Sequence, residues 1–169
     1  MVSIEVARGD ITRENVDAIV TAANESLMGG GGVDGAVHRA AGPRLAEAGA
    51  ALAPCPPGEA VATPAFNLTP PIRHVIHTVG PVWEGGGHGE ADVLASCYRR
   101  SLQVADDLGL TSIAFPAIAT GIYGYPPAEA AHIAITTLRT TPTSLTLVRL
   151  VAFDESTESL LTTELSRTD

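Results

Sequence analysis

The chain contains no lysine: its ten basic residues are all arginines, set against 19 Asp and Glu, and its formal net charge is −9. Proteins that bind nucleic acid usually present a basic patch, so this balance disfavours RNA or another anionic polymer as a partner. If the protein holds phosphate, we expect backbone N–H groups and helix ends to do so. The composition therefore favours a small phosphorylated ligand.

Long hydrophobic runs are missing as well, and cysteines are few. No apolar run reaches the length of a membrane span, and Met1–Val6 lacks the basic start and long apolar centre of a signal peptide. The two cysteines, Cys55 and Cys97, indicate reduced thiols rather than a disulfide framework. We therefore expect a cytoplasmic protein that does not associate with a membrane.

Apolar residues are plentiful enough for a globular protein. Of 169 residues, 45% are hydrophobic and 17% charged, which excludes a disordered chain. This length is sufficient for one domain with a substantial core. We predict a single domain over residues 1–169.

A run of glycines lies between a predicted strand and a predicted helix. Val16–Ala23 is an apolar segment short enough for a buried strand, Gly29–Gly32 follow it, and Ala36–Ala41 is typical of a helix. Glycines let successive N–H groups turn toward a phosphate, and a helix N-terminus adds partial positive charge. A flexible linker is the alternative, but a linker is usually longer and richer in serine. The stretch favours a ligand-binding loop.

A second turn of the same kind comes later in the chain. Ala117–Pro126 lies between a predicted strand and a predicted helix, and it carries Gly121 and Gly124 beside threonine and aromatic residues. As an isolated motif it is weak. A diphosphate, however, is best held from two sides, so the two turns together predict a diphosphate site.

The remaining pattern alternates between strands and helices. We predict strands at residues 3–7, 16–23, 59–63, 73–79, 111–116 and 145–152, and helices at 34–41, 43–48, 91–108, 127–138 and 156–165, with Gly49 weakening the second helix. This order indicates an α/β fold with a mostly parallel sheet covered on both faces. Ligands bind at the carboxyl ends of such strands. Four segments follow strands and are expected to meet at one cleft: Asp10, Asn24–Asp34, Ala117–Tyr125 and Phe153–Asp154.

Several common catalytic motifs are excluded by their context. Gly30–Gly35 fits the dinucleotide-binding pattern, but no acidic residue closes a strand about 20 residues later, as that fold requires. His74 and His77 have opposite parity on a strand and cannot bind one metal from one face. Ser26 lies in no nucleophile elbow. Because the metal-binding spacings of His and Cys are also lacking, we expect no metal.

Several polar and aromatic residues each have two interpretations. Asp10 either caps a short helical turn or accepts from an exocyclic amine, and Asp34 is either a helix N-cap or a functional carboxylate. His38 either packs to brace the glycine loop or acts in catalysis. Phe153 either ends a buried strand or stacks on a base. The stretch around Trp83 is either a surface connection or a lid.

These segments together resemble the macrodomain family, in particular its MacroD-type branch of ADP-ribose hydrolases. The resemblance covers nearly the whole chain, through Gly9–Thr12, Ala22–Asn24, Leu27–His38, His77–Pro81 and Thr120–Pro126. It implies a three-layer α/β/α macrodomain with a mixed, mostly parallel six-stranded sheet. It also implies removal of mono-ADP-ribose from acidic side chains of modified proteins, and deacetylation of O-acetyl-ADP-ribose, by a monomer that needs no metal or other cofactor.

The resemblance also assigns roles at the two ends of ADP-ribose. Asp10 would accept from the adenine amine, Ile11 would donate its backbone N–H to the ring, and Phe153 would lie against the adenine. At the other end, Asn24 would bind a hydroxyl of the distal ribose, and Asp34 would orient that ribose and help to activate a water.

The diphosphate would be held between the two turns. Backbone N–H groups from both turns would bind it, namely those of Gly32, Val33, Thr120, Gly121, Ile122 and Tyr123, and Tyr123 would also wall the distal ribose. Thr21, which would also lie among the ligand-binding residues, stands where many members have asparagine. A non-catalytic module that reads ADP-ribose shares all the phosphate contacts, so only Thr21, Asn24 and Asp34 distinguish it from the hydrolase.

Overall fold

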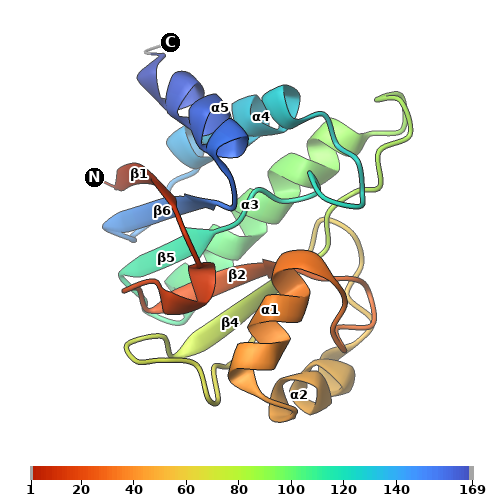
Figure 1. The fold of residues 1–169 in the computed structure, drawn as a ribbon, viewed down its shortest axis with the longest axis vertical. Coiled ribbons are helices and arrows are strands. Elements are labelled where there is room, and N and C mark those ends of the chain that lie inside the picture. Colours follow the sequence, from red (N-terminus) through yellow and green to blue (C-terminus); the bar gives the residue numbers. More distant parts are fainter. Residues whose placement is uncertain (1, 168–169) are drawn as a thin grey trace.

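The computed structural model describes residues 2–167 as a six-stranded sheet with helices on both faces (Figure 1). The strands lie in the order β1 (Ser3–Arg8), β6 (Leu147–Ala152), β5 (Ser112–Phe115), β2 (Ala18–Ala22), β4 (His74–Thr78) and β3 (Ala60–Pro64). All neighbours pair in parallel except β3, which is antiparallel to β4. The predicted mixed, mostly parallel sheet is confirmed. The predicted single domain also includes residues 1, 168 and 169, which lie outside the described residues.

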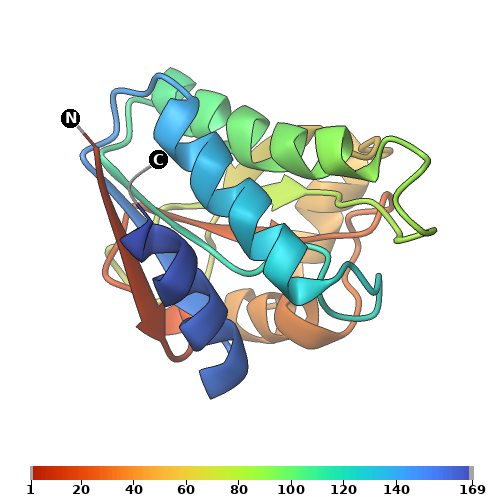
Figure 2. The ribbon, with the colours of Figure 1, turned by 90° about the horizontal axis from the view of Figure 1, so that it is seen from above.

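The helices form the two outer layers (Figures 1 and 2). α3 (Glu90–Asp107) and α4 (Pro127–Thr140) cover one face, and α1 (Gly32–Ala41) and α2 (Arg44–Leu52) cover the other. α5 (Glu155–Ser166) packs on α4 and on the edge made by β1 and β6, and a short 3₁₀ turn, η1 (Ile11–Arg13), follows β1. None of the helices within residues 2–167 is long and apolar enough to cross a membrane.

The central strands are buried on both faces, which explains why they are continuous apolar runs. Ile19 and Val75 face the core beneath α1, whereas their neighbours Val20 and Ile76 face the core beneath α3 and α4. Successive side chains of a strand point to opposite faces, so each strand of this kind joins two cores. Burial of both faces fixes the register at the strand ends, where the functional loops begin.

The bounds of the helices agree with the prediction within one or two residues, except at α2, and two of the differences bear on the site. α1 begins at Gly32 instead of residue 34, and its N-cap is Gly31, so the interpretation of Asp34 as an N-cap is wrong. α2 continues through Gly49 to Leu52. Gly49 does not weaken this helix but permits it to pack, because a Cβ there would lie 2.0 Å from the carbonyl oxygen of Leu27.

Candidate functional site

A cleft of about 230 Å³ opens at the carboxyl ends of the central strands. Gly30–Asp34, which span the end of the glycine run and the first turn of α1, line it, and so do Gly121–Tyr123 of the second turn. Ala22–Asn24, at the end of β2 and just beyond it, and Gly80, which follows β4, complete this part of the lining. The prediction that the two turns face one cleft is confirmed.

Main-chain groups dominate the electrostatics of the cleft. Within the described part of the chain, no arginine lines it. α1 begins in it, and the N-cap, Gly31, has no side chain that could bind the first N–H groups of the helix. Those N–H groups have no intrahelical acceptor and carry the positive end of the helix dipole. The cleft can therefore bind an anion through the backbone alone.

Asp34 lies in the first turn of α1 and is only 3% exposed. Its Oδ1 accepts a hydrogen bond from Thr21 Oγ1 at 2.8 Å, whereas its Oδ2 has no hydrogen-bond partner among residues 2–167. Burial raises the pKa of Asp34, although the Thr21 hydroxyl and His38 partly oppose this. An unpartnered, buried carboxylate oxygen is costly unless a donor reaches it. Asp34 is thus poised to accept a proton or a hydrogen bond from a ligand or water.

Gly30 lies next to this carboxylate and to the Asn24 amide. A Cβ at Gly30 would lie 3.4 Å from Asn24 Nδ2 and 3.7 Å from Asp34 Oδ2. The Asn24 amide also braces the loop, because Nδ2 donates to the carbonyl of Gly29 at 3.1 Å and Oδ1 accepts from Ser26 Oγ at 2.6 Å. The predicted bond between Asn24 and a ribose hydroxyl stays a prediction.

Two histidines stand behind Asp34. His38 Nε2 lies 3.6 Å from Asp34 Oδ1, and the His38 ring packs under Gly29, as the bracing interpretation predicts. The ring of His77 is 6.4 Å from that of His38, and its Nε2 is 2.9 Å from Thr63 Oγ1. Burial, and secondly His38, lower the pKa of His77 to about 4. His77 is therefore neutral near pH 7 and leaves the charge of Asp34 uncompensated from that side.

The second turn does not place all of its predicted residues in the cleft. Gly121, Ile122 and Tyr123 line it, and Ile122 is 96% exposed at its rim. The Thr120 side chain donates from Oγ1 to the carbonyl of Ala117 at 2.9 Å and borders a small hollow against α4 and α5. The role of its backbone N–H toward the diphosphate stays a prediction. Thr21, also predicted to bind ligand, is fully buried and contacts Asp34.

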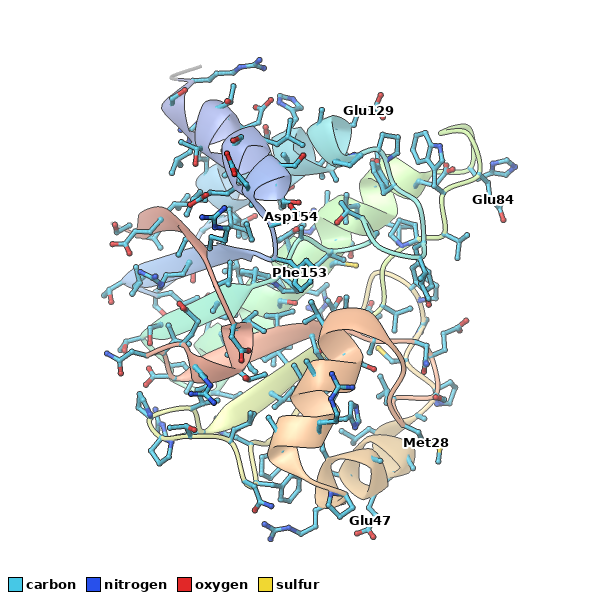
Figure 3. All side chains as sticks on the ribbon, in the orientation of Figure 1. Met28, Glu47, Glu84, Glu129, Phe153 and Asp154 are labelled. Atoms are coloured by element: carbon cyan, nitrogen blue, oxygen red, sulfur yellow. The ribbon has the colours of Figure 1, made fainter. Side chains whose placement is uncertain are left out.

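The residues predicted for adenine are not among those that line this cleft, so only two of the four segments expected to meet there do so, Asn24–Asp34 and Ala117–Tyr125. Asp10 caps η1, accepting from the backbone N–H of Thr12 at 2.9 Å, and it borders a separate groove between η1 and α1. Ile11 is buried in the core beneath α1. Phe153 follows β6 and is 83% exposed (Figure 3), so its interpretation as a buried strand end is wrong. The roles of Asp10, Ile11 and Phe153 toward adenine stay predictions.

Glu90, the first residue of α3, was not predicted from the sequence. Its carboxylate accepts hydrogen bonds from three backbone N–H groups of the preceding loop. Four glycines within Gly85–Gly89, directly before an acid, are the signal that could have indicated this arrangement. As for metals, no group of three or more His, Cys, Asp or Glu within residues 2–167 could hold an ion.

Fold and cleft together define an α/β protein that presents main-chain donors and one buried carboxylate at the ends of its parallel strands. The family model described as Macro domain matches residues 20–134, and the chain belongs to this family. The resemblance read from the sequence motifs is therefore confirmed at the level of the family.

Individual relatives cover most of the chain. It is 61% identical over 138 residues to a macro domain-containing protein of Chlorobaculum tepidum, covering 82% of this chain and 79% of that one. It is 54% identical over 164 residues, 93% of this chain and 92% of the other, to a Citrobacter rodentium protein named O-acetyl-ADP-ribose deacetylase.

Solved macrodomains share the fold closely. The Oceanobacillus iheyensis macrodomain with ADP superposes with a TM-score of 0.90 at 43% identity, over 96% of this chain and 89% of that one. The Trypanosoma brucei macrodomain in complex with ADP-ribose gives 0.84 at 41% identity, over 94% and 67%. The predicted macrodomain architecture is confirmed.

Proposed function

We propose that the protein binds ADP-ribose in this cleft and hydrolyses esters of its distal ribose. The substrates would be mono-ADP-ribose on acidic side chains of proteins, and O-acetyl-ADP-ribose. The unpartnered Oδ2 of Asp34 carries the proposal, because a reader module has no need of a buried carboxylate with an elevated pKa. The relative named O-acetyl-ADP-ribose deacetylase and the ADP-ribose complex of a similar macrodomain support it.

Binding would rest on the diphosphate. The N–H groups at the start of α1, around Gly32 and Val33, face the second turn across the cleft, and both sides are suited to phosphate oxygens. Tyr123 lines the same space and would lie beside the distal ribose. With the diphosphate held there, that ribose would reach Asp34.

Hydrolysis requires an oriented water and a base. A water that donates to Asp34 Oδ2 would lose a proton to this carboxylate as its oxygen attacks the ester carbonyl. The bond between the carbonyl carbon and the ribose oxygen then breaks, Asp34 returns the proton to that ribose oxygen, and the carboxylic acid and ADP-ribose are released. The elevated pKa makes Asp34 a stronger base than an ordinary carboxyl group. General-base assistance of this kind contributes about 10²–10⁴-fold, and positioning of the water adds to it.

The test compares two carboxylate-to-amide variants. We expect Asp34→Asn to bind ADP-ribose within about threefold of wild type by calorimetry while it loses turnover of a glutamate-linked ADP-ribosylated protein by at least about 100-fold. Glu47→Gln, an exposed position on α2 far from the cleft (Figure 3), is the matched control and should retain both properties.

Each outcome separates the candidate functions. Wild-type protein that binds ADP-ribose but releases none from any ester would be a reader. Full turnover in Asp34→Asn would remove that residue from the mechanism. Wild-type protein that does not bind ADP-ribose would refute the proposal altogether.

A further inference from the structure

The loop from Pro81 to Gly89, called here the Trp83 loop, connects β4 to α3 and projects beyond the sheet next to the second turn (Figures 1 and 2). Gly85, Gly86 and Gly89 all have positive φ values, between 76° and 93°. A loop with so much glycine has many conformations available to it, so one conformation must be selected by specific contacts.

Glu90 supplies those contacts from the start of α3. The N–H groups of Glu84 and Gly86 donate to its Oε2 at 2.9 and 3.0 Å, and the N–H of His88 donates to its Oε1 at 2.7 Å. The residue is 2% exposed. Burial by itself would raise the pKa of Glu90, but the backbone donors outweigh it and lower that pKa to about 2. The carboxylate is therefore ionised whenever the protein is folded near neutral pH.

The conformation that Glu90 selects reaches the cleft through Trp83. The backbone N–H of Trp83 donates to the carbonyl of Tyr123 at 2.8 Å, and the Trp83 ring packs on Tyr125 with the centroids 4.7 Å apart. Gly86 folds back onto that ring, since a Cβ there would lie 2.9 Å from Trp83 Cη2. Tyr123 is part of the cleft lining, so the Trp83 loop supports one wall of the cleft from outside.

We propose that Glu90 is a positioning residue for ligand binding: its carboxylate holds the Trp83 loop in the conformation in which Trp83 supports Tyr123 and the second turn. The inference rests on the proposed binding of ADP-ribose. Glu90 acts through Trp83 and has no contact with the reacting ester. Its loss should therefore lower the fraction of molecules whose cleft is ready to bind, and apparent affinity falls in proportion to that fraction.

Trp83 is the only tryptophan of the chain, so its fluorescence reports directly on this loop. Glu90→Gln retains the size of the side chain but removes the charge and one acceptor. We expect a red-shifted emission and an ADP-ribose Kd raised by about tenfold. Glu84→Gln is the matched control: that side chain is on the same loop, is 61% exposed and points outward (Figure 3), and its removal should change neither quantity.

Turnover separates positioning from general damage. In Glu90→Gln we expect a higher KM with kcat nearly unchanged, because saturating substrate selects the competent loop. This pattern is the reverse of the one expected for Asp34→Asn. Wild-type emission, Kd and KM in Glu90→Gln would overturn the inference, and so would a shifted emission with an unchanged Kd. Wild-type protein without ADP-ribose binding would instead refute the proposed function and this inference with it.

A second variant guards against misfolding of the first. Gly86→Ala leaves Glu90 in place but puts a Cβ against the Trp83 ring, and it should shift emission and raise Kd in the same direction. If Gly86→Ala folds and shifts the emission while Kd stays at the wild-type value, the loop does not support the cleft and the inference fails.

Discussion

Thr21 Oγ1 donates a hydrogen bond to Asp34 Oδ1 at 2.8 Å, and both residues are buried. The bond joins β2 to the first turn of α1 across 13 positions of sequence. It engages one oxygen of the carboxylate and leaves the other for the cleft. The hydroxyl therefore orients the base that the proposed hydrolysis requires.

Removal of this donor should affect turnover more than binding. In Thr21→Val the buried Oδ1 loses the hydrogen bond that Thr21 donates, a change that costs about 1–3 kcal/mol. We expect kcat to fall by about tenfold or more, with the calorimetric Kd for ADP-ribose within about threefold of wild type. Thr21→Ser keeps the hydroxyl and should retain most of the activity. Equal kcat values in Thr21→Val and Thr21→Ser would show that the bond is dispensable.

His77 should make the fold sensitive to mild acid. Its pKa is lowered from 6.5 to about 4 in the folded protein, so the unfolded chain binds its proton first. The stabilisation from neutral His77 is present above pH 6.5 and is lost as the pH falls toward 4, on the order of 3 kcal/mol in all. We expect His77→Gln to have a lower Tm at pH 7.5 but a smaller decrease in Tm between pH 7 and 4.5. Parallel Tm curves for the two proteins would contradict this assignment.

Gly49 should resist substitution even though it lies within a helix. Alanine is favoured over glycine in helices by about 1 kcal/mol. In Gly49→Ala, however, the new Cβ would overlap the carbonyl oxygen of Leu27 in the glycine loop. We expect a net loss of stability of about 1–3 kcal/mol in urea unfolding, and weaker binding of ADP-ribose. Gly87→Ala, with nothing within 4 Å of its Cβ, is the matched control and should behave like wild type.

The sequence predicted the layers of the fold because these strands are buried on both faces. Short, largely apolar segments such as Ala18–Ala22, separated by stretches of helical periodicity, favour a mostly parallel sheet. The position of β6 between β1 and β5 did not follow from any local pattern. It depends on how α4 returns the chain to the sheet, which is a property of long-range packing.

The candidate site was predictable where it depends on local backbone. Both turns follow parallel strands, so their meeting at one edge was a direct consequence of topology. Thr120 and Gly121 are adjacent in sequence, yet only Gly121 lines the cleft, because the turn directs the Thr120 side chain toward α4. Thr21 donates to the buried Asp34, and Glu90 organises a glycine-rich loop. Both arrangements depend on tertiary contacts, which the spacing of residues in the sequence does not reveal.

Peptide N–H groups do not titrate over the range in which proteins stay folded, unlike the histidines or lysines that often bind phosphate. A cleft built from them would keep the same hold on a diphosphate in mildly acidic and mildly alkaline solution. A slope in the activity against pH that the stability of the fold does not account for would then belong to the Asp34 carboxylate. Varying the pH would then test catalysis separately from ligand binding.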